Sequence, residues 1–276
     1  MEVSAAMIKE LKEKTGAGLV DCKKTLQETG GDMEKSVKIL MEKGLKKADK
    51  KAGRSANEGT VVYKIEGKKG LVLKVNCETD FVAKTDNFKK FVEDVLELIF
   101  KKNYAFSEQL PADVEELRRN VIAKVGENIV ISDWKFIESK GELYPYVHRD
   151  MFSVKVAMIA DFTVGEKNDE SSQMLKNIAM QITAMNPVAV DVESIPTQKL
   201  SEIKATFLEE AKQTGKPEKI LENIVKGKLE KYYSESLLMN QAYIMDEEKN
   251  VKSVIDDFVK TKGVHLKVNS FVRVSL

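Results

Sequence analysis

A change of hydrophobic period between positions 71 and 100 constrains the fold of this chain most. Leu71, Leu73 and Val75 alternate with their neighbours, which is the two-residue period of a strand. Beyond Phe88 the apolar residues recur at helical spacing, at positions 91, 92, 95 and 99. The chain must therefore pass from a strand to an amphipathic helix within the polar stretch 76–87.

The connector between that strand and that helix carries one large aromatic residue, Phe81, beside the carboxylate of Asp80. Polar residues at 85–87 can accept hydrogen bonds from the free N–H groups at the helix start. An aromatic ring on a short, rigidly held connector suits a docking anchor. A core phenylalanine that closes the strand–helix corner is the other interpretation, and local residue chemistry by itself favours it.

The rest of the core repeats this pattern. Residues 60–65 alternate and turn through Gly67–Gly70 into the strand just described, and a helix to Val125 and a strand at 129–137 follow the connector. Past Gly141 the order recurs, with strands at 143–147 and 154–162, a helix around 175–182 and a last strand at 266–274. Two related β-β-α…β halves predict two small antiparallel sheets, each covered by helices on one face.

Residues 1–44 have the pattern of three short helices. Ser4 and Asp32 suit the N-caps of the first and third. The middle helix, from about Gly18 to Thr29, is expected to bury its apolar side chains, Leu19, Cys22 and Leu26. So short a segment makes a small core with little room for a catalytic cavity, so we predict a docking module.

Lysine and arginine dominate the next segment, 43–54. Such a segment is either a basic arm for nucleic acid or for an acidic protein face, or a solvated helical linker. The linker interpretation is favoured, because no aromatic residue is interleaved to stack on bases.

An insertion in the second half predicts an antiparallel helical hairpin at about 197–232. Apolar residues at helical spacing lie on both sides of a turn at 215–217, with Thr197 as the expected cap of the first helix and Pro217 as the first residue of the second. Residues 239–246 are expected to be irregular, and a last helix is expected from 251 to 259.

The predicted fold class is therefore α+β in four segments. A three-helix (UBA-like) module at 1–44 and a basic linker at 45–58 precede two core halves, 59–140 and 141–276. The helical hairpin is an insertion in the second half. A chain of 276 residues is long enough to build such units around a sizeable core.

Charge and cysteine content narrow the class of protein. Lys plus Arg number 45 against 44 Asp plus Glu, which argues against a general phosphate-binding protein. Cys22 and Cys77 lie far apart and fit free thiols in a reducing compartment. No apolar run approaches the roughly 20 residues that span a bilayer, and residues 1–11 look like neither a secretory signal nor a transit peptide. We therefore expect a cytoplasmic protein.

No set of residues suited to covalent catalysis is visible in the sequence. His148 and His265 are the two histidines, and neither has a Ser, Cys or metal-spaced carboxylate partner nearby. The patterns G-x-x-x-x-G-K-[ST] and G-x-G-x-x-G do not occur, so direct nucleotide binding is not expected. The sequence predicts a binding protein that is not an enzyme and uses no cofactor or metal.

Two separated motifs resemble the signatures of the elongation factor Ts family. The first is Thr15-Gly16-Ala17-Gly18 followed by Asp21-Cys22-Lys23-Lys24, and the second is Thr79-Asp80-Phe81-Val82-Ala83-Lys84 followed by Phe88. A third block, Val125-Gly126-Glu127-Asn128-Ile129, agrees as well. The resemblance covers the whole chain and is strongest before about position 135. In this family a helical hairpin like the one expected at about 197–232 projects from the core.

The resemblance implies a guanine-nucleotide exchange factor for elongation factor Tu, a GTPase of translation. It implies that Phe81 inserts between helices of the GTPase domain, with Asp80 beside it and with Thr79 and Val82 fixing the loop. Such a wedge shifts the groups that hold Mg²⁺, and the phosphate loop rearranges so that GDP leaves.

The resemblance also implies contacts away from the wedge. Val20, Asp21 and Lys23 are expected to place the N-terminal module on the GTPase domain, and Val125 to pack beside the wedge. His148 is expected to approach a different domain of the partner, although a strand-end histidine facing solvent fits its sequence equally well. The family often continues with glycines after this histidine, where this chain has Arg149-Asp150-Met151-Phe152. A C-terminal helical extension found in some members is not expected here, because the sequence stops at the last predicted strand.

Two other classes of function remain open. An RNA- or ribosome-binding protein would use the basic segment 43–54, and its affinity for RNA would fall steeply with salt. A helical scaffold would use the hairpin at 197–232 as its interaction arm. Such a scaffold would lose its function on deletion of the hairpin but would tolerate Phe81→Ala.

Overall fold

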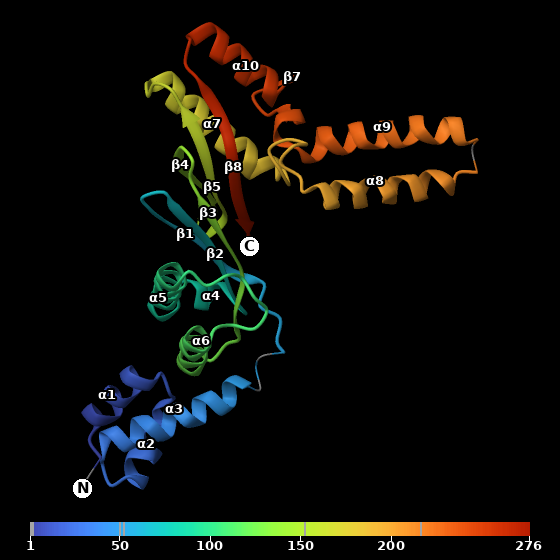
Figure 1. Cartoon of the computed structure of the whole chain (residues 1–276). Coiled ribbons are helices and arrows are strands. Elements are labelled where there is room, and N and C mark those ends of the chain that lie inside the picture. The colour runs from blue at the N-terminus through green and yellow to red at the C-terminus, as the bar shows by residue number, and fades with distance from the viewer. Residues whose placement is uncertain (1–2, 50, 52, 152, 216) are drawn as a thin grey trace.

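The molecule has three visibly distinct parts. Figure 1 shows a three-helix bundle at the N-terminal end, a core of two sheets flanked by helices, and a long two-helix hairpin that projects from the core. This arrangement confirms the predicted α+β class. The computed structural model describes residues 3–49, 51, 53–151, 153–215 and 217–276, and at 45–49 and 219 its description is limited to the backbone. Among these residues no helix combines the length and the apolar character needed to cross a bilayer.

The N-terminal bundle consists of α1 (Ala5–Thr15), α2 (Leu19–Glu28) and α3 (Met33–Asp49). Ser4 caps α1, because its hydroxyl accepts a hydrogen bond from the N–H of Met7 at 3.2 Å. The bundle has a small core made of four buried side chains: Leu11, Cys22, Leu26 and Leu40. The three predicted helices are therefore present, around a core of the modest size that so short a segment allows.

The structure of this region differs from the sequence expectation at Leu19, and it describes only part of the basic segment 43–54. The sequence predicts Leu19 in the core, but its side chain is 55% exposed. It is the first residue of α2 and lies one turn before Cys22, at the edge of a bundle too small to cover it. The third helix continues to Asp49, so part of the basic segment 43–54 is helical. The side chains at 45–50 of that segment lie outside the described residues.

The first core half is a three-stranded antiparallel sheet of order β1-β2-β3 covered by two helices. Its elements are β1 (Glu58–Glu66), β2 (Lys69–Cys77), β3 (Ile129–Glu138), α5 (Asp86–Lys102) and α6 (Ala112–Val125). Alternate residues of β2 pack with the apolar faces of both helices in one buried cluster. Thr85 caps α5 by accepting a hydrogen bond from the N–H of Phe88 at 3.3 Å. The strand with the two-residue period and the helix with the helical period therefore bury their apolar faces in one core.

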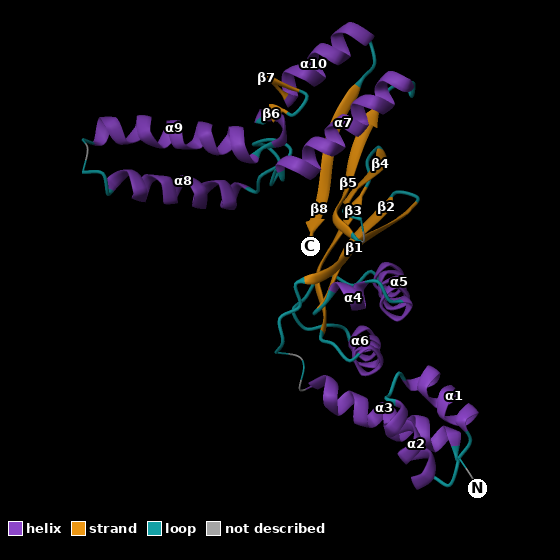
Figure 2. Cartoon of the chain, turned by 180° about the vertical axis from the view of Figure 1, so that it is seen from behind, coloured by secondary structure: helices purple, strands orange, loops and turns teal. Residues whose placement is uncertain are grey.

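The second core half repeats this topology. Its sheet has the order β4-β5-β8, and Figure 2 shows α7 and α10 beside it. The elements are β4 (Glu142–Arg149), β5 (Val154–Val164), α7 (Asp169–Met185), α10 (Val251–Lys262) and β8 (Leu266–Ser275). In each half the second strand is central, and the last strand pairs with it after the intervening helices. The recurring sequence pattern is thus a repeated strand arrangement.

The two sheets pack against each other through the faces that the helices leave open. The contact is made by six buried side chains from both sheets: Val61, Val72, Ile137, Ala157, Ile159 and Val274. As a result, β2 and β5 are buried on both faces. Each sheet therefore has helices on one side and the other sheet on the other side.

A buried carboxylate fixes the joint between the halves. Asp161 accepts hydrogen bonds from the hydroxyl of Ser139 (2.6 Å), the N–H of Lys140 (2.9 Å), the N–H of Gly141 (3.1 Å) and the amide of Asn269 (3.1 Å). Burial raises the pKa of Asp161, but these donors outweigh that effect and hold the pKa below its usual value. The linking residues 139–141 are therefore tied to the central strand of the second sheet.

The projecting hairpin consists of α8 (Thr197–Lys212) and α9 (Glu218–Ser236) (Figures 1 and 2). The expected helix starts are each wrong by one residue. Pro196, not Thr197, is the residue before α8, and Pro217 precedes α9 instead of beginning it. Both prolines have a helix-compatible φ of −54° but an extended ψ of 134° or 147°, so each ends the incoming loop.

The stretch expected to be irregular, 239–246, is ordered by a buried amide. It forms a short 3₁₀ helix (Leu238–Asn240) and a ribbon of β6 (Ala242–Tyr243) and β7 (Asp246–Asn250). The side chain of Gln181, on α7, donates to the carbonyl of Ala242 (3.0 Å) and accepts from the N–H of Ile244 (2.9 Å). The backbone groups of this stretch are thus paired by a side chain from a distant helix, and the local sequence gives no sign of that pairing.

Ile159, fully buried between the sheets, offers a test of this packing. Ile159→Ala should lower the free energy of unfolding by about 2–5 kcal/mol, because it leaves a cavity where the halves meet. Ile220→Ala on α9 is the matched control, since Ile220 is 44% exposed and should lose less than about 1 kcal/mol. Urea unfolding followed by circular dichroism measures both losses. Equal losses would contradict a close contact between the sheets.

Candidate partner-binding site

Phe81 lies on the four-residue helix α4 (Asp80–Ala83), between β2 and α5. Its side chain is 76% exposed, so the core interpretation of this phenylalanine is wrong. The strand–helix corner is closed instead by Val82 and Phe88, which are buried in the core cluster of the first half. Successive helical residues point about 100° apart, so burial of Val82 turns the ring of Phe81 outward.

The start of α4 is held by hydrogen bonds at Thr79. Its hydroxyl oxygen accepts from the N–H of Val82 (3.3 Å), which caps the short helix. Its own N–H and hydroxyl donate to the two carboxylate oxygens of Glu127, at 2.9 and 2.6 Å. Sequence reasoning gave Glu127 no role. Its single signal was membership of the block 125–129, and a pairing across 48 residues leaves no local trace.

The strand residue before this connector supports it from inside. The thiol of Cys77 donates to the carbonyl of Thr79 at 3.1 Å. Burial raises the pKa of Cys77 to about 12, and the charge of Glu127 adds to that effect. Cys22 and Cys77 are both buried free thiols, as the sequence predicts. At neutral pH Cys77 is therefore a neutral packing residue and not a nucleophile.

Lys84 links the carboxylate and the ring of the site. Its ammonium lies 2.6 Å from a carboxylate oxygen of Asp80 and 5.8 Å from the centre of the Phe81 ring. The hydrogen bond from Lys84 holds the pKa of Asp80 below its usual value. Asp80 is therefore ionised at neutral pH, and its ion pair with Lys84 holds the carboxylate beside the exposed ring.

A second exposed apolar surface lies at the start of α2. Val20 is 79% exposed beside the exposed Leu19, and the side chains of Asp21 and Lys23 are exposed as well. Sequence reasoning missed Leu19 as a surface residue. Val125, half-buried at the end of α6, lines the same cleft as Asp21, between the bundle and the core. The structure thus brings together Val125 and Asp21 of the predicted site.

The bundle rests directly on α6. Gly16 has a φ of +67°, and a Cβ there would lie 2.6 Å from the carbonyl oxygen of Lys124. Past the bundle, the ammonium of Lys51 donates to the carbonyl of Gly126. These contacts connect the bundle to the loop that carries Glu127.

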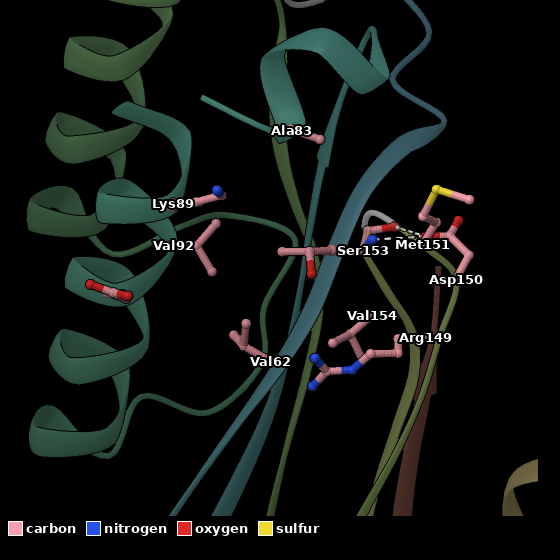
Figure 3. A pocket seen from close by; sticks show the side chains of 11 residues that line it. Val62, Ala83, Lys89, Val92, Arg149, Asp150, Met151, Ser153 and Val154 are labelled. Carbon is pink, nitrogen blue, oxygen red and sulfur yellow. Dashed lines mark hydrogen bonds between the residues drawn. The ribbon is translucent and has the colours of Figure 1, made fainter. Parts of the chain in front are cut away.

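The end of β4 borders a cleft between the two halves, with a volume of about 260 Å³ (Figure 3). His148 is exposed there, but its neighbour Arg149 is the one that lines the cleft. Met151, in the turn that follows, is 87% exposed, and Ala83 of α4 forms part of the opposite wall. This cleft brings the turn after His148 close to the Phe81 helix. Phe152 lies outside the described residues.

The chemistry of these surfaces suits recognition of another protein. Exposed aromatic and aliphatic side chains on short, well-held elements are typical of docking anchors. In the described part of the chain, no three His, Cys, Asp or Glu side chains are grouped so that they could hold a metal ion. The fold and these exposed surfaces are typical of a protein that binds another protein.

Comparison with known proteins gives a consistent result. The sequence model of the family described as Elongation factor TS matches residues 78–276. Elongation factor Ts of Aquifex aeolicus is 40% identical over 292 aligned residues, which cover 100% of this chain and 98% of the relative. The proteins of that name from Nitratiruptor sp. and Halothermothrix orenii are also 40% identical, each over 100% of this chain and 93% of its own length.

The chain belongs to the elongation factor Ts family. It is therefore a nucleotide exchange factor for elongation factor Tu in translation. An exchange factor alters how fast a bound nucleotide leaves and makes or breaks no covalent bond, which agrees with a site made of docking surfaces.

The Asp80–Lys84 pair predicts a pH response. In Lys84→Ala the pKa of Asp80 should rise toward the ordinary value of about 3.9, because its main hydrogen-bond donor is gone. In the intact pair the stabilisation is present above the unfolded-state pKa and is lost as pH falls through the lowered folded-state pKa. Carboxyl NMR titration measures the pKa. The control is Lys90→Ala, whose partner is Asp94, and an unchanged Asp80 pKa in Lys84→Ala would contradict the assignment.

Proposed function

We propose that this chain releases GDP from elongation factor Tu by inserting Phe81 between helices of the GTPase domain. The observation that carries the proposal is a ring that is 76% exposed on a helix anchored at Thr79 and Val82. Docking buries apolar surface that water already contacts, so nothing in this chain has to unfold first. Asp80 enters beside the ring, and the ion pair with Lys84 sets the orientation of the Asp80 carboxylate.

The mechanism is a difference in affinity between two states of the partner. A GTPase holds GDP through its phosphate loop and a Mg²⁺ ion. An exchange factor that binds the nucleotide-free state more tightly lowers the affinity for GDP by the same factor. The ring shifts the helices behind the Mg²⁺ site, so the ion and the phosphate loop lose their support. In this scheme the chain itself binds neither the nucleotide nor the metal.

The size of the effect requires more than one contact. A release rate raised about 10⁴-fold corresponds to about 5.5 kcal/mol of differential stabilisation. Burial of one aromatic side chain supplies about 1.5–3 kcal/mol. We therefore propose that the module at 1–44 docks through Val20, Asp21 and Lys23, that Val125 packs beside the Phe81 wedge, and that His148 contacts a second domain.

The direct experiment is release of labelled GDP from purified elongation factor Tu with and without this chain. A rate that rises with chain concentration and saturates supports exchange through a complex. A rate independent of the chain would remove the proposal.

Phe81→Ala should reduce stimulated GDP release by about 10–100-fold, which equals about 1.4–2.7 kcal/mol and lies in the range expected when a central interface anchor is truncated. Folding should be unaffected, since the ring is exposed. Phe106→Ala, at another exposed phenylalanine (49% exposed), is the matched control. Wild-type exchange by Phe81→Ala, with the complex still forming, would rule out the wedge.

Val20→Asp should weaken binding to elongation factor Tu by about tenfold or more, because it places a charge in a desolvated apolar contact. The release rate at saturating chain should change much less, since the Phe81 helix is untouched. Lys38→Asp introduces the same residue at an exposed position of α3 as a control. Titration calorimetry with the nucleotide-free partner measures both affinities. Equal affinities would exclude docking through this face.

A further inference from the structure

The loop between α6 and β3, residues 126–128, and the connector at 78–79 bind each other through two pairs of residues. The carboxylate of Glu127 takes both donors of Thr79, at 2.9 and 2.6 Å. In return, the N–H of Asn128 donates to the carboxylate of Glu78 at 2.6 Å. Hydrogen bonds to ionised groups are roughly twice as strong as neutral ones, so this is a firm junction between two loops.

The basic linker reinforces the same junction. Arg54 lies 3.5 Å from a carboxylate oxygen of Glu78, and its carbonyl accepts from the side-chain amide of Asn128 at 2.7 Å. Asn128 is buried, so its contacts are protected from competition by water. The connector is thereby held from outside the first sheet as well as from within it.

This junction fixes a helix that cannot fix itself. With four residues, α4 is far shorter than a helix that is stable alone. The start of α4 depends on the Thr79 hydroxyl. This hydroxyl donates a hydrogen bond to the Glu127 carboxylate, and its oxygen accepts one from the N–H of Val82. The direction of that hydroxyl, and with it the first turn of α4, is set by a carboxylate from another loop.

We infer that Glu127 is a positioning residue for Phe81: it orients the exposed ring through Thr79 and so sets the rate of nucleotide release. The inference rests on the proposed function of Phe81. Glu127 need not touch the partner. Without its carboxylate the Thr79 N–H and hydroxyl lose their acceptor, and the first turn of α4, which carries Phe81, is held less firmly although Phe88 stays buried.

Labelled GDP release from elongation factor Tu tests this inference with full-length variants. Glu127→Ala should lower the rate at saturating chain about tenfold, which equals about 1.4 kcal/mol. The chain concentration for half-maximal release should change less than about threefold. Glu127→Gln keeps an acceptor oxygen and should recover a large part of the rate. Glu116→Ala, at an exposed glutamate of α6, should behave as wild type.

A double-mutant cycle separates positioning from general stability. In a Phe81→Ala background, Glu127→Ala should cause no further loss, because the ring through which it acts is gone. Losses that multiply in the double variant would overturn the inference, as would a Glu127→Ala rate equal to that of Glu116→Ala. A slow Phe81→Ala with a normal Glu127→Ala removes the inference alone. A wild-type rate for Phe81→Ala removes the proposed function and the inference together.

A second variant keeps the test decisive if Glu127→Ala folds poorly. Thr79→Val removes the hydroxyl that donates to Glu127 but keeps the backbone N–H. It should lower the saturated rate about threefold and should also lose its effect in the Phe81→Ala background. Thermal unfolding of each variant shows which of the two substitutions is to be used, and a wild-type rate for a folded Thr79→Val would contradict the positioning role.

Discussion

Burial of the inner faces of the two sheets is the contact on which the rest of the molecule depends. Three strands with helices on one side would expose an apolar face to water. Here each sheet covers the other, so the strands β2 and β5 are buried on both faces at the centre of one core. The Phe81 helix follows β2 directly and therefore starts from one of the best-held points of the chain.

The elements of the core could be predicted because two short-range signals were strong. The alternation of Leu71, Leu73 and Val75 and the helical spacing after Phe88 each correspond to one buried face. The orientation of the connector between them could not be predicted in the same way. Phe81, Val82 and Phe88 are all apolar candidates to close that corner, and the hydrogen bonds that hold Thr79 at the start of α4 come from Glu127, far away in sequence.

The other differences from the sequence expectation have the same cause. Residues 239–246 contain no regular period, yet the amide of Gln181 orders them. Leu19 has the spacing of a core residue but belongs to a bundle whose core is too small to reach it. Local patterns specify which face of an element is apolar, whereas the size of the neighbouring core and distant polar groups decide whether that face is covered. The candidate site depends on one such non-local contact, between Glu127 and Thr79.

The seating of the N-terminal bundle has a consequence for how the two anchors act. The bundle contacts α6 at Gly16, where the backbone of Lys124 leaves no space for a side chain. Val20 and Phe81 are thus carried by one connected body and not by two domains on a free tether. In the proposed docking, once one of these two residues has bound, the second meets its target at a high local concentration and loses little additional entropy. Their fixed separation then favours a partner whose two binding pockets lie at the matching distance.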